Sequence, residues 1–193
     1  KYLANLLLLN RQGKYTEAAE LVEIVIKELD VFGDTMNKEK NILFSYLIAY
    51  VYFGNGQLKE ALLWINKVLN DNENTLRQDI YSYARLFNLI IHYELGNFDL
   101  LEYIIKSTSR YLSKKERDYH VERLIVDYIK RLAKKQSDES RVEIFKEVKH
   151  ESSEDFADSN NRVILEYIDL NSWITSKIQN QSFTELVQAR GKA

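Results

Sequence analysis

Apolar residues recur every three to four positions along most of this chain, and short polar or glycine-containing segments separate the apolar runs. The clearest case is residues 42–69, where the stretch ILFSYLIAYVYF ends at Phe53 and a second amphipathic stretch begins at Leu58. The residues GNG at 54–56 interrupt the two stretches. A turn this short permits only antiparallel packing of the flanking segments, so the pattern predicts a helical hairpin.

The same reasoning, extended along the chain, predicts an all-α protein of about eight to ten helices with no sheet. Residues 30–37 are expected to form a loop, and Asn37 is expected to cap the helix that follows it. The helix near 139–151 is expected to be short and weakly apolar, starting at Ser137 or Asp138. The predicted helices are 1–11, 16–29, 38–53, 57–69, 75–95, 99–112, 114–135, 139–151, 160–178 and a short one from residue 182.

The hairpin pattern occurs three times. The turns read RQGKYTEAAE, GNGQLKEALL and ELGNFDLLEY, and in each a glycine is followed by a polar residue and then an apolar one. The three glycines, Gly13, Gly56 and Gly96, are separated by 43 and 40 residues. A period in this range is typical of a solenoid built from helix pairs.

These turns resemble those of the tetratricopeptide repeat (TPR) family, in which an alanine follows the turn aromatic by three residues. Ala18 and Ala61 match that alanine, whereas Leu101 departs from it, and Tyr52 matches the aromatic near the end of the first helix. The chain has no proline, although one commonly ends a TPR, and its period exceeds the family's usual ~34 residues. The resemblance covers about residues 1–112 and implies a TPR-like α-solenoid of antiparallel helix pairs.

Two further segments, ELGNF at 94–98 and WITSKI at 173–178, are similar to the C-termini of uncharacterised bacterial TPR proteins. We therefore divide the expected single domain into repeats at 1–135 and a C-terminal helical cap at 136–193. A solenoid leaves the apolar face of its last repeat uncovered, and the helix 160–178 has the apolar stripe to cover it. We expect this helix to pack over 114–135 or into the groove, with Trp173 buried and its indole N–H hydrogen-bonded.

Composition narrows the possible functions. The chain has 193 residues and a net charge of −2, so no global charge attracts it to nucleic acid or anionic lipid. It contains no cysteine, which excludes thiol catalysis and cysteine-based metal sites. It has no nucleotide-binding, zinc-protease or serine-elbow motif, and its three histidines are far apart in sequence. We therefore expect no enzyme activity, no cofactor and no metal.

No apolar run approaches the ~18 residues of a membrane helix, so membrane insertion is not expected. The absence of cysteine fits a reducing compartment, and we expect a cytoplasmic protein. The chain begins at Lys1, already inside an apolar-periodic stretch. We interpret it as a fragment, the C-terminal part of a longer protein.

Aromatic side chains are the candidates for partner recognition. The first helix of each TPR pair lines the concave face, and the resemblance places six residues of these helices there. Aromatic residues with polar tips suit peptide recognition, although the same residues could instead pack between helices or under the C-terminal helix. The candidate peptide-binding residues are Tyr46, Tyr50, Phe53, Tyr83, Ile90 and Tyr93.

Charge is segregated late in the chain. Residues 113–135 carry a net charge of +4 and residues 138–160 carry −5. Two interpretations are open: the two segments neutralise each other as neighbours, or the basic one binds phosphate or an acidic partner. The candidate anion-binding residues are Lys130, Arg131, Lys134 and Lys135. Nucleic-acid binding is not expected, because no loop combines these cations with exposed aromatic residues.

The repeat and the missing catalytic motifs favour one function, a non-catalytic scaffold that binds a protein or a peptide. The alternative is a regulatory domain that senses a ligand or peptide and controls an upstream effector domain. The aromatic groove and the interpretation of the chain as a fragment motivate that alternative.

Overall fold

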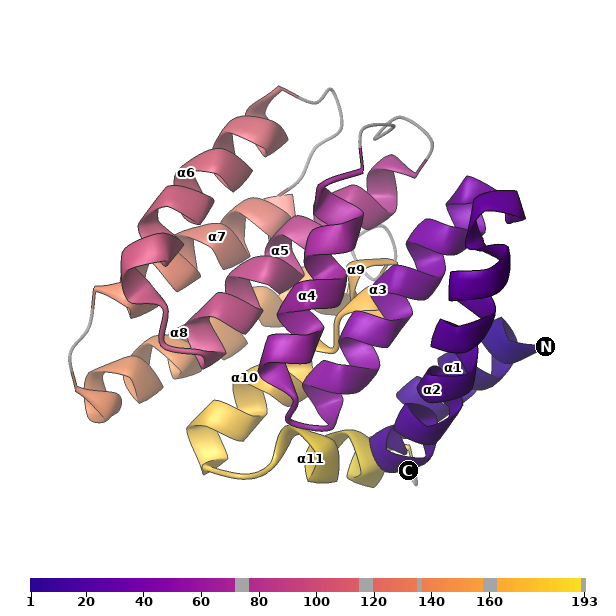
Figure 1. The fold of residues 1–193 in the computed structure, drawn as a ribbon. Coiled ribbons are helices and arrows are strands. Elements are labelled where there is room, and N and C mark those ends of the chain that lie inside the picture. Colours follow the sequence, from indigo (N-terminus) through magenta and orange to yellow (C-terminus); the bar gives the residue numbers. More distant parts are fainter. Residues whose placement is uncertain (72–76, 115–119, 135–136, 158–162, 192–193) are drawn as a thin grey trace. The chain divides into compact units, whose positions relative to one another are not determined.

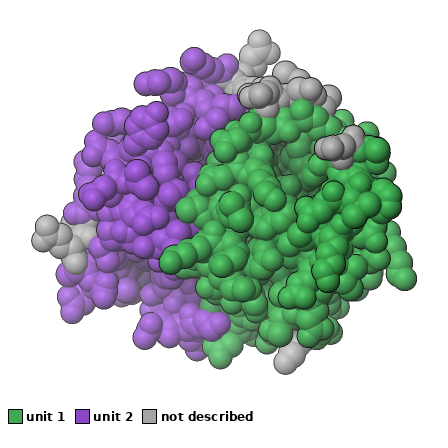
Figure 2. Space-filling model, viewed as in Figure 1, with its two compact units in different colours: residues 1–84, 183–193 green, residues 85–182 purple. Residues whose placement is uncertain are grey.

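The computed structural model describes residues 1–71, 77–114, 120–134, 137–157 and 163–191. Every regular element in these ranges is helical, as the sequence predicted. The chain forms two compact units, coloured separately in Figure 2: residues 1–84 with 183–193 form unit 1, and residues 85–182 form unit 2. The division falls within the helix α5 (Gln78–Glu94) and at the start of α11 (Phe183–Arg190).

Unit 1 contains two helical hairpins, the first residues of α5 and one helix from the C-terminal end of the chain (Figure 1). Its central helix is α3, which packs most extensively on α4 and also contacts α1 and α2. Because neighbours surround α3, apolar residues cover nearly all of its faces. The elements are α1 (Tyr2–Arg11), α2 (Tyr15–Phe32), the 3-10 turn η1 (Gly33–Thr35), α3 (Lys38–Gly54), α4 (Leu58–Leu69) and α11 (Phe183–Arg190).

The three predicted hairpin turns are confirmed, and they share one geometry. The turn glycine has a left-handed φ of +66° at Gly13, +76° at Gly56 and +69° at Gly96. Its N–H donates to the carbonyl three residues earlier, and the next N–H donates to the carbonyl five residues earlier. These two hydrogen bonds form a Schellman motif, which favours glycine because a Cβ is strained at positive φ. The repeat in the sequence is therefore also a repeat of turn structure.

Unit 2 contains the rest of α5 and five further helices. Within it α7 packs on α6 and α8, and α10 packs on α8. The helix 160–178 was expected to pack over 114–135 or into the groove; its second half, α10, instead packs mainly on α8. The elements are α6 (Phe98–Ser113), α7 (His120–Ala133), α8 (Asp138–Ala157), α9 (Val163–Tyr167) and α10 (Leu170–Gln179).

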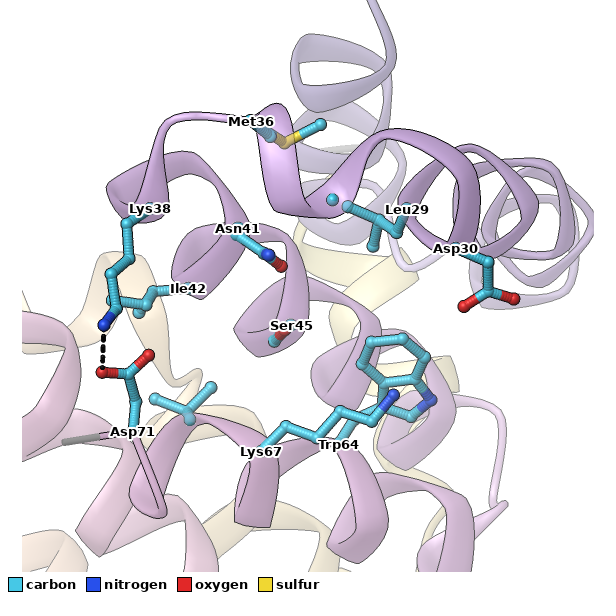
Figure 3. Close-up of a pocket in the computed structure, with 12 residues that line it drawn as sticks. Leu29, Asp30, Met36, Lys38, Asn41, Ile42, Ser45, Trp64, Lys67 and Asp71 are labelled. Carbon is cyan, nitrogen blue, oxygen red and sulfur yellow. Dashed lines mark ion pairs between the residues drawn. The ribbon is translucent and has the colours of Figure 1, made fainter. Parts of the chain in front are cut away.

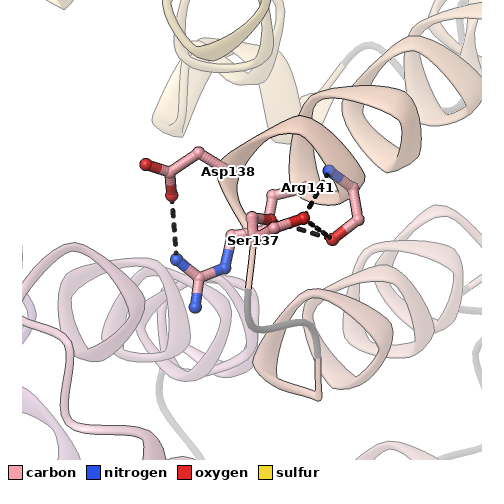
Figure 4. Close-up of polar contacts among 4 residues, drawn as sticks. Ser137, Asp138 and Arg141 are labelled. Atoms are coloured by element: carbon pink, nitrogen blue, oxygen red, sulfur yellow. Dashed lines mark hydrogen bonds and ion pairs between the residues drawn. The ribbon is translucent and has the colours of Figure 1, made fainter.

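Short polar side chains set the start of α8. Ser137 Oγ accepts a hydrogen bond from the backbone N–H of Ser140 at 3.3 Å, and Ser140 Oγ donates to the carbonyl of Ser137 at 2.9 Å (Figure 4). Asp138 pairs with Arg141 at 3.2 Å in the first turn. The predicted start of the helix is confirmed, but α8 is 20 residues long and not short.

Two other predictions were wrong in detail. The expected loop 30–37 is mostly helical, because α2 continues to Phe32 and η1 follows it. The expected single helix 160–178 is broken at Asp169, whose side chain accepts a hydrogen bond from Ser172 N–H at 3.1 Å and so caps a new helix. This break gives eleven α-helices in the described ranges, one more than expected. The Asn37 cap is confirmed, with Glu39 N–H donating to its side chain at 2.9 Å.

No helix in the part of the chain that the structure describes is both long and apolar enough to cross a membrane.

Candidate functional site

Unit 1 contains a cavity of about 460 Å³, which we take as the candidate functional site (Figure 3). It lies between the C-terminal end of α2, η1, the first half of α3 and the C-terminal half of α4. Binding sites for small ligands typically enclose about 300–1,000 Å³ and combine apolar walls with a few polar groups. The cavity meets the size criterion, and its lining combines apolar and polar residues in about equal measure. None of these residues was predicted from the sequence as a site residue.

Helical periodicity explains which residues face the cavity. The Asn37 cap fixes the start of α3, so that Lys38, Ile42 and Ser45 lie on one stripe at intervals of four and three residues. On α4, Trp64 and Val68 lie on a second stripe at an interval of four. The sequence signal was therefore present, as apolar stripes that also carry charged or hydroxyl residues at the ends of two neighbouring helices.

Apolar side chains form the interior of the cavity. Ile42 is 4% exposed, Trp64 is 7% exposed and Val68 is 1% exposed. Leu29 and Met36 add apolar surface from the α2 side. An apolar group that enters this space leaves water at a gain of about 25 cal/mol per Å² of surface buried.

An ion pair lies at one side of the cavity. Lys38 Nζ and Asp71 Oδ1 are 3.1 Å apart and join the start of α3 to the end of α4 (Figure 3). Both side chains are partly exposed, so the pair contributes little stability, on the order of 0–1 kcal/mol. Its main effect is to neutralise one cation and one anion of the lining.

A second lysine contacts the indole in the cavity. Lys67 Nζ lies 3.5 Å from the centroid of the Trp64 ring, a cation–π contact. In the described ranges no carboxylate lies within 4 Å of Lys67 Nζ, and no cation lies within 4 Å of the carboxylate of Asp30. Asp30 extends from α2 (Figure 3). The lining therefore has one free positive and one free negative group.

Two neutral polar side chains complete the lining. Asn41 and Ser45 both come from α3, and Ser45 is only 6% exposed. Neither side chain makes a hydrogen bond within the described residues, so both can donate to and accept from a ligand.

The six predicted peptide-binding residues lie mainly in the core. Five of them are 0–8% exposed, and only Tyr93 is half-buried. In unit 1 the aromatic side chains are covered by Phe183 of α11, whose ring stacks on Tyr15 at 6.0 Å. Phe183 also meets Tyr50 and Phe53 edge-on at 6.4 and 5.4 Å. The cover of Tyr50 and Phe53 is therefore α11, a different helix from the expected cap 160–178, and the six residues offer no open aromatic surface. The five buried residues are Tyr46, Tyr50, Phe53, Tyr83 and Ile90.

Tyr93 belongs to a separate aromatic cluster in unit 2. Its ring meets Phe145 at 6.0 Å and Trp173 at 6.1 Å, both edge-on. Burial raises the pKa of the Tyr93 hydroxyl to about 12, so this group stays neutral at physiological pH. A neutral phenol surrounded by aromatic rings is suited to packing rather than to proton transfer.

The predicted anion patch is partly used within the protein. Lys130, Arg131 and Lys134 are exposed on α7 or directly after it, and Lys135 lies outside the described residues. Arg131 pairs with Glu147 of α8 and lies over the Tyr128 ring at 5.0 Å. The hydrogen bond to Glu147 raises the pKa of Arg131. This pair joins the basic helix to the acidic one, as the interpretation of mutual neutralisation predicts.

In the described ranges, no group of three His, Asp or Glu side chains is arranged as metal ligands would be. His92 is 7% exposed, and its Nδ1 accepts a hydrogen bond from the Asn97 side chain at 3.2 Å. This contact holds the end of α5 to the Gly96 turn and gives His92 a packing role.

Comparison with known proteins adds no relative. No family model matches the chain, and neither a curated protein nor a solved structure matches it. The cavity and the repeated hairpins are therefore the features that bear on function.

Proposed function

We propose that this chain is a non-catalytic binding module, in which TPR-like helix pairs support a cavity that receives part of a protein or peptide partner. The observation that carries the proposal is the cavity itself. It combines buried apolar walls with one free cation and one free anion, and a lining of this kind is suited to binding and orienting a group.

The helix pairing supports the comparison with TPR proteins. Three hairpins have the same Schellman turn, and α3 contacts both helices of the preceding pair. Stacked helix pairs of this kind bury a continuous core and leave ordered surfaces for partners. The proposed pairs are α1 with α2, α3 with α4, and α5 with α6.

Peptide selection on the intact chain tests the proposal. A library of random 12-residue peptides would be enriched on the wild-type chain and depleted on a Trp64→Ala variant, so that only cavity-dependent peptides remain. Binding would then be followed by ¹⁹F NMR of the chain labelled with 5-fluorotryptophan, which reports Trp64 and Trp173 as separate resonances. We expect the Trp64 resonance to shift while the Trp173 resonance stays. Recovery of no cavity-dependent peptide would contradict the proposal.

A second function is favoured by the size of the cavity. A volume of about 460 Å³ is in the range for small ligands, and the cavity lies within a single compact unit. We therefore retain a regulatory ligand-sensing domain as the second candidate, in which the bound molecule stabilises unit 1. The readout for this candidate is a rise in the melting temperature of the intact chain with ligand concentration.

A further inference from the structure

We propose that the cavity between α2, α3 and α4 binds a free α-amino acid with a large apolar or aromatic side chain. This inference rests on the second candidate function, ligand sensing, and it names the ligand class of that same site. It comes from the way in which charge and apolar surface are separated within the cavity.

Charged groups lie at the exposed part of the cavity and apolar groups lie inside. Asp30 and Lys67 are exposed, whereas Ile42, Trp64 and Val68 are buried. A complementary ligand has an apolar body that enters the cavity and a charged head that stays near water. The apolar body supplies most of the binding free energy, and the head supplies orientation.

The head must carry both signs of charge. Lys38 and Asp71 neutralise each other at 3.1 Å, which leaves Lys67 and Asp30 as the charged groups for a ligand. Lys67 comes from α4 and Asp30 from α2, so the two free charges come from different helices of the lining (Figure 3). An α-amino acid has an ammonium and a carboxylate on one carbon, directly above its side chain. In this pose the carboxylate accepts hydrogen bonds from Lys67, and the ammonium donates to Asp30.

The interior fits the side chain of such a ligand. Trp64 gives an aromatic wall, and Lys67 already keeps its ammonium 3.5 Å from that ring, next to the expected carboxylate. Ser45 and Asn41 on α3 add neutral hydrogen-bonding groups to the lining. A leucine, phenylalanine or tyrosine side chain matches this mixture, whereas a charged side chain would be left without a partner.

Calorimetry on the intact chain tests the inference with four probes: L-leucine, L-phenylalanine, N-acetyl-L-leucine and L-leucine methyl ester. The acetylated probe lacks the ammonium and the ester lacks the carboxylate, while both keep the apolar body. We expect each modified probe to bind about tenfold more weakly than L-leucine, as the loss of one charge-assisted hydrogen bond predicts.

Two variants assign each charge to its partner. Asp30→Asn should weaken L-leucine about tenfold and leave N-acetyl-L-leucine unchanged, because the latter has no ammonium to lose. Lys67→Met, which keeps the apolar stem, should weaken L-leucine similarly and leave the methyl ester unchanged. The matched controls are Glu20→Gln and Lys59→Met, which change exposed charges of α2 and α4 outside the cavity lining and should bind every probe as the wild type does.

The outcomes separate this inference from the scaffold proposal. If free amino acids show no binding at about 10 mM, or if L-leucine binds no better than its two derivatives, the inference is wrong. If the selected 12-residue peptides still shift the Trp64 resonance in that case, the scaffold function stands without it. If the binding of L-leucine survives both cavity variants unchanged, the amino acid binds elsewhere and the assignment to this cavity fails.

Discussion

Trp173 on α10 donates a hydrogen bond from its indole Nε1 to Oε1 of Glu94 at 2.7 Å, across 79 residues of sequence. Lys177 pairs with the other carboxylate oxygen of Glu94 at 2.5 Å. Trp173 is 3% exposed, and its ring meets Phe145 edge-on at 5.3 Å. The sequence predicted both the burial and the hydrogen bond of Trp173, and both are confirmed. These contacts attach α10 to the end of α5 within unit 2.

Replacement of Trp173 tests how much stability this attachment provides. Trp173→Ala should lower the free energy of unfolding by roughly 3–5 kcal/mol, because it removes a buried aromatic side chain and leaves a cavity. Trp173→Phe keeps an aromatic ring and loses the hydrogen bond, so its effect should be nearer 1–2 kcal/mol. Urea unfolding followed by circular dichroism measures both values. If the two variants lose the same free energy of unfolding, the hydrogen bond accounts for the whole effect and the buried ring contributes nothing.

The sequence predicted this part of unit 2 because the signals are local. An apolar stripe with one tryptophan indicates a buried helix face, and the glycine turns fix where the helices end. The break at Asp169 was missed because an aspartate inside an apolar-periodic run fits equally well on an exposed helix face or at a cap. The choice depends on how α10 packs in the folded protein, where Asp169 caps a new helix instead of continuing the preceding one.

The cavity and the cover of α11 could not be predicted for a different reason. Both depend on which helix faces meet across long stretches of sequence, which periodicity does not specify. Phe183 lies 133 residues after Tyr50, yet its ring occupies the aromatic surface that we had assigned to a peptide. Of the candidate residues, Tyr50 and Phe53 contact Phe183, whereas Tyr93 belongs to a separate cluster in unit 2.

Gly54 tests the packing of the first two hairpins. A Cβ at this position would lie 2.4 Å from Cγ of the Tyr15 ring, and that ring is held by Tyr50 and Phe183. Gly54→Ala should therefore destabilise the chain by about 1–3 kcal/mol, although alanine favours a helix over glycine by up to ~1 kcal/mol.

The double variant Gly54→Ala with Tyr15→Ala serves as the control. It should show an interaction energy of at least about 0.5 kcal/mol, because the clash disappears with the ring. Thermal or urea unfolding of the two single variants and the double variant gives this value. Strict additivity would mean that the two side chains do not meet.

Ala61 tests the register of the second hairpin. This residue is 0% exposed on the face of α4 that packs against α3. Ala61→Leu should overpack the interface and lower the free energy of unfolding by ~1–3 kcal/mol. Leu63→Ala on the same helix is the matched control: Leu63 is 61% exposed, and its truncation should change stability by no more than about 0.5 kcal/mol. An unchanged melting temperature for Ala61→Leu would refute the register.

His92 makes stability depend on pH. Burial lowers the pKa of His92 below its usual value of about 6.5, and its Nδ1 accepts a hydrogen bond from Asn97 that requires the neutral ring. The unfolded chain therefore binds a proton more readily than the folded chain. The contribution of this residue is fully present above pH 6.5 and is lost as the pH falls through the folded pKa.

Urea unfolding at pH 7.5 and pH 5.0 measures this effect. The wild type should lose more stability between the two values than His92→Gln, whose amide oxygen can accept the Asn97 hydrogen bond at either pH. The difference between the stability losses of the wild type and His92→Gln gives the contribution of His92, because both proteins contain the carboxylates that titrate in the same pH range. If both proteins lose the same free energy of unfolding between pH 7.5 and pH 5.0, His92 is solvated in the folded chain.

The last prediction concerns α11, which forms part of unit 1 although it follows α10 of unit 2. Its anchors include the Phe183 ring, the buried Val187, and two side-chain hydrogen bonds to turn carbonyls. Thr184 Oγ1 donates to the carbonyl of Gly54 at 2.6 Å, and Gln188 Nε2 donates to the carbonyl of Gly13 at 3.0 Å. An eight-residue helix has little stability alone, so these contacts must supply it.

Loss of one anchor should therefore release the whole helix locally. Phe183→Ala should lower the free energy of local opening by roughly 2 kcal/mol, less than for a fully buried phenylalanine because this side chain is half-buried. Amide hydrogen exchange in residues 183–190 should then accelerate about thirtyfold, while exchange in α10 stays unchanged because α10 belongs to the other unit. Glu185→Ala, an exposed change in the same helix, is the control and should leave both helices as they are. Faster exchange throughout the chain would instead mean that α11 opens only with global unfolding.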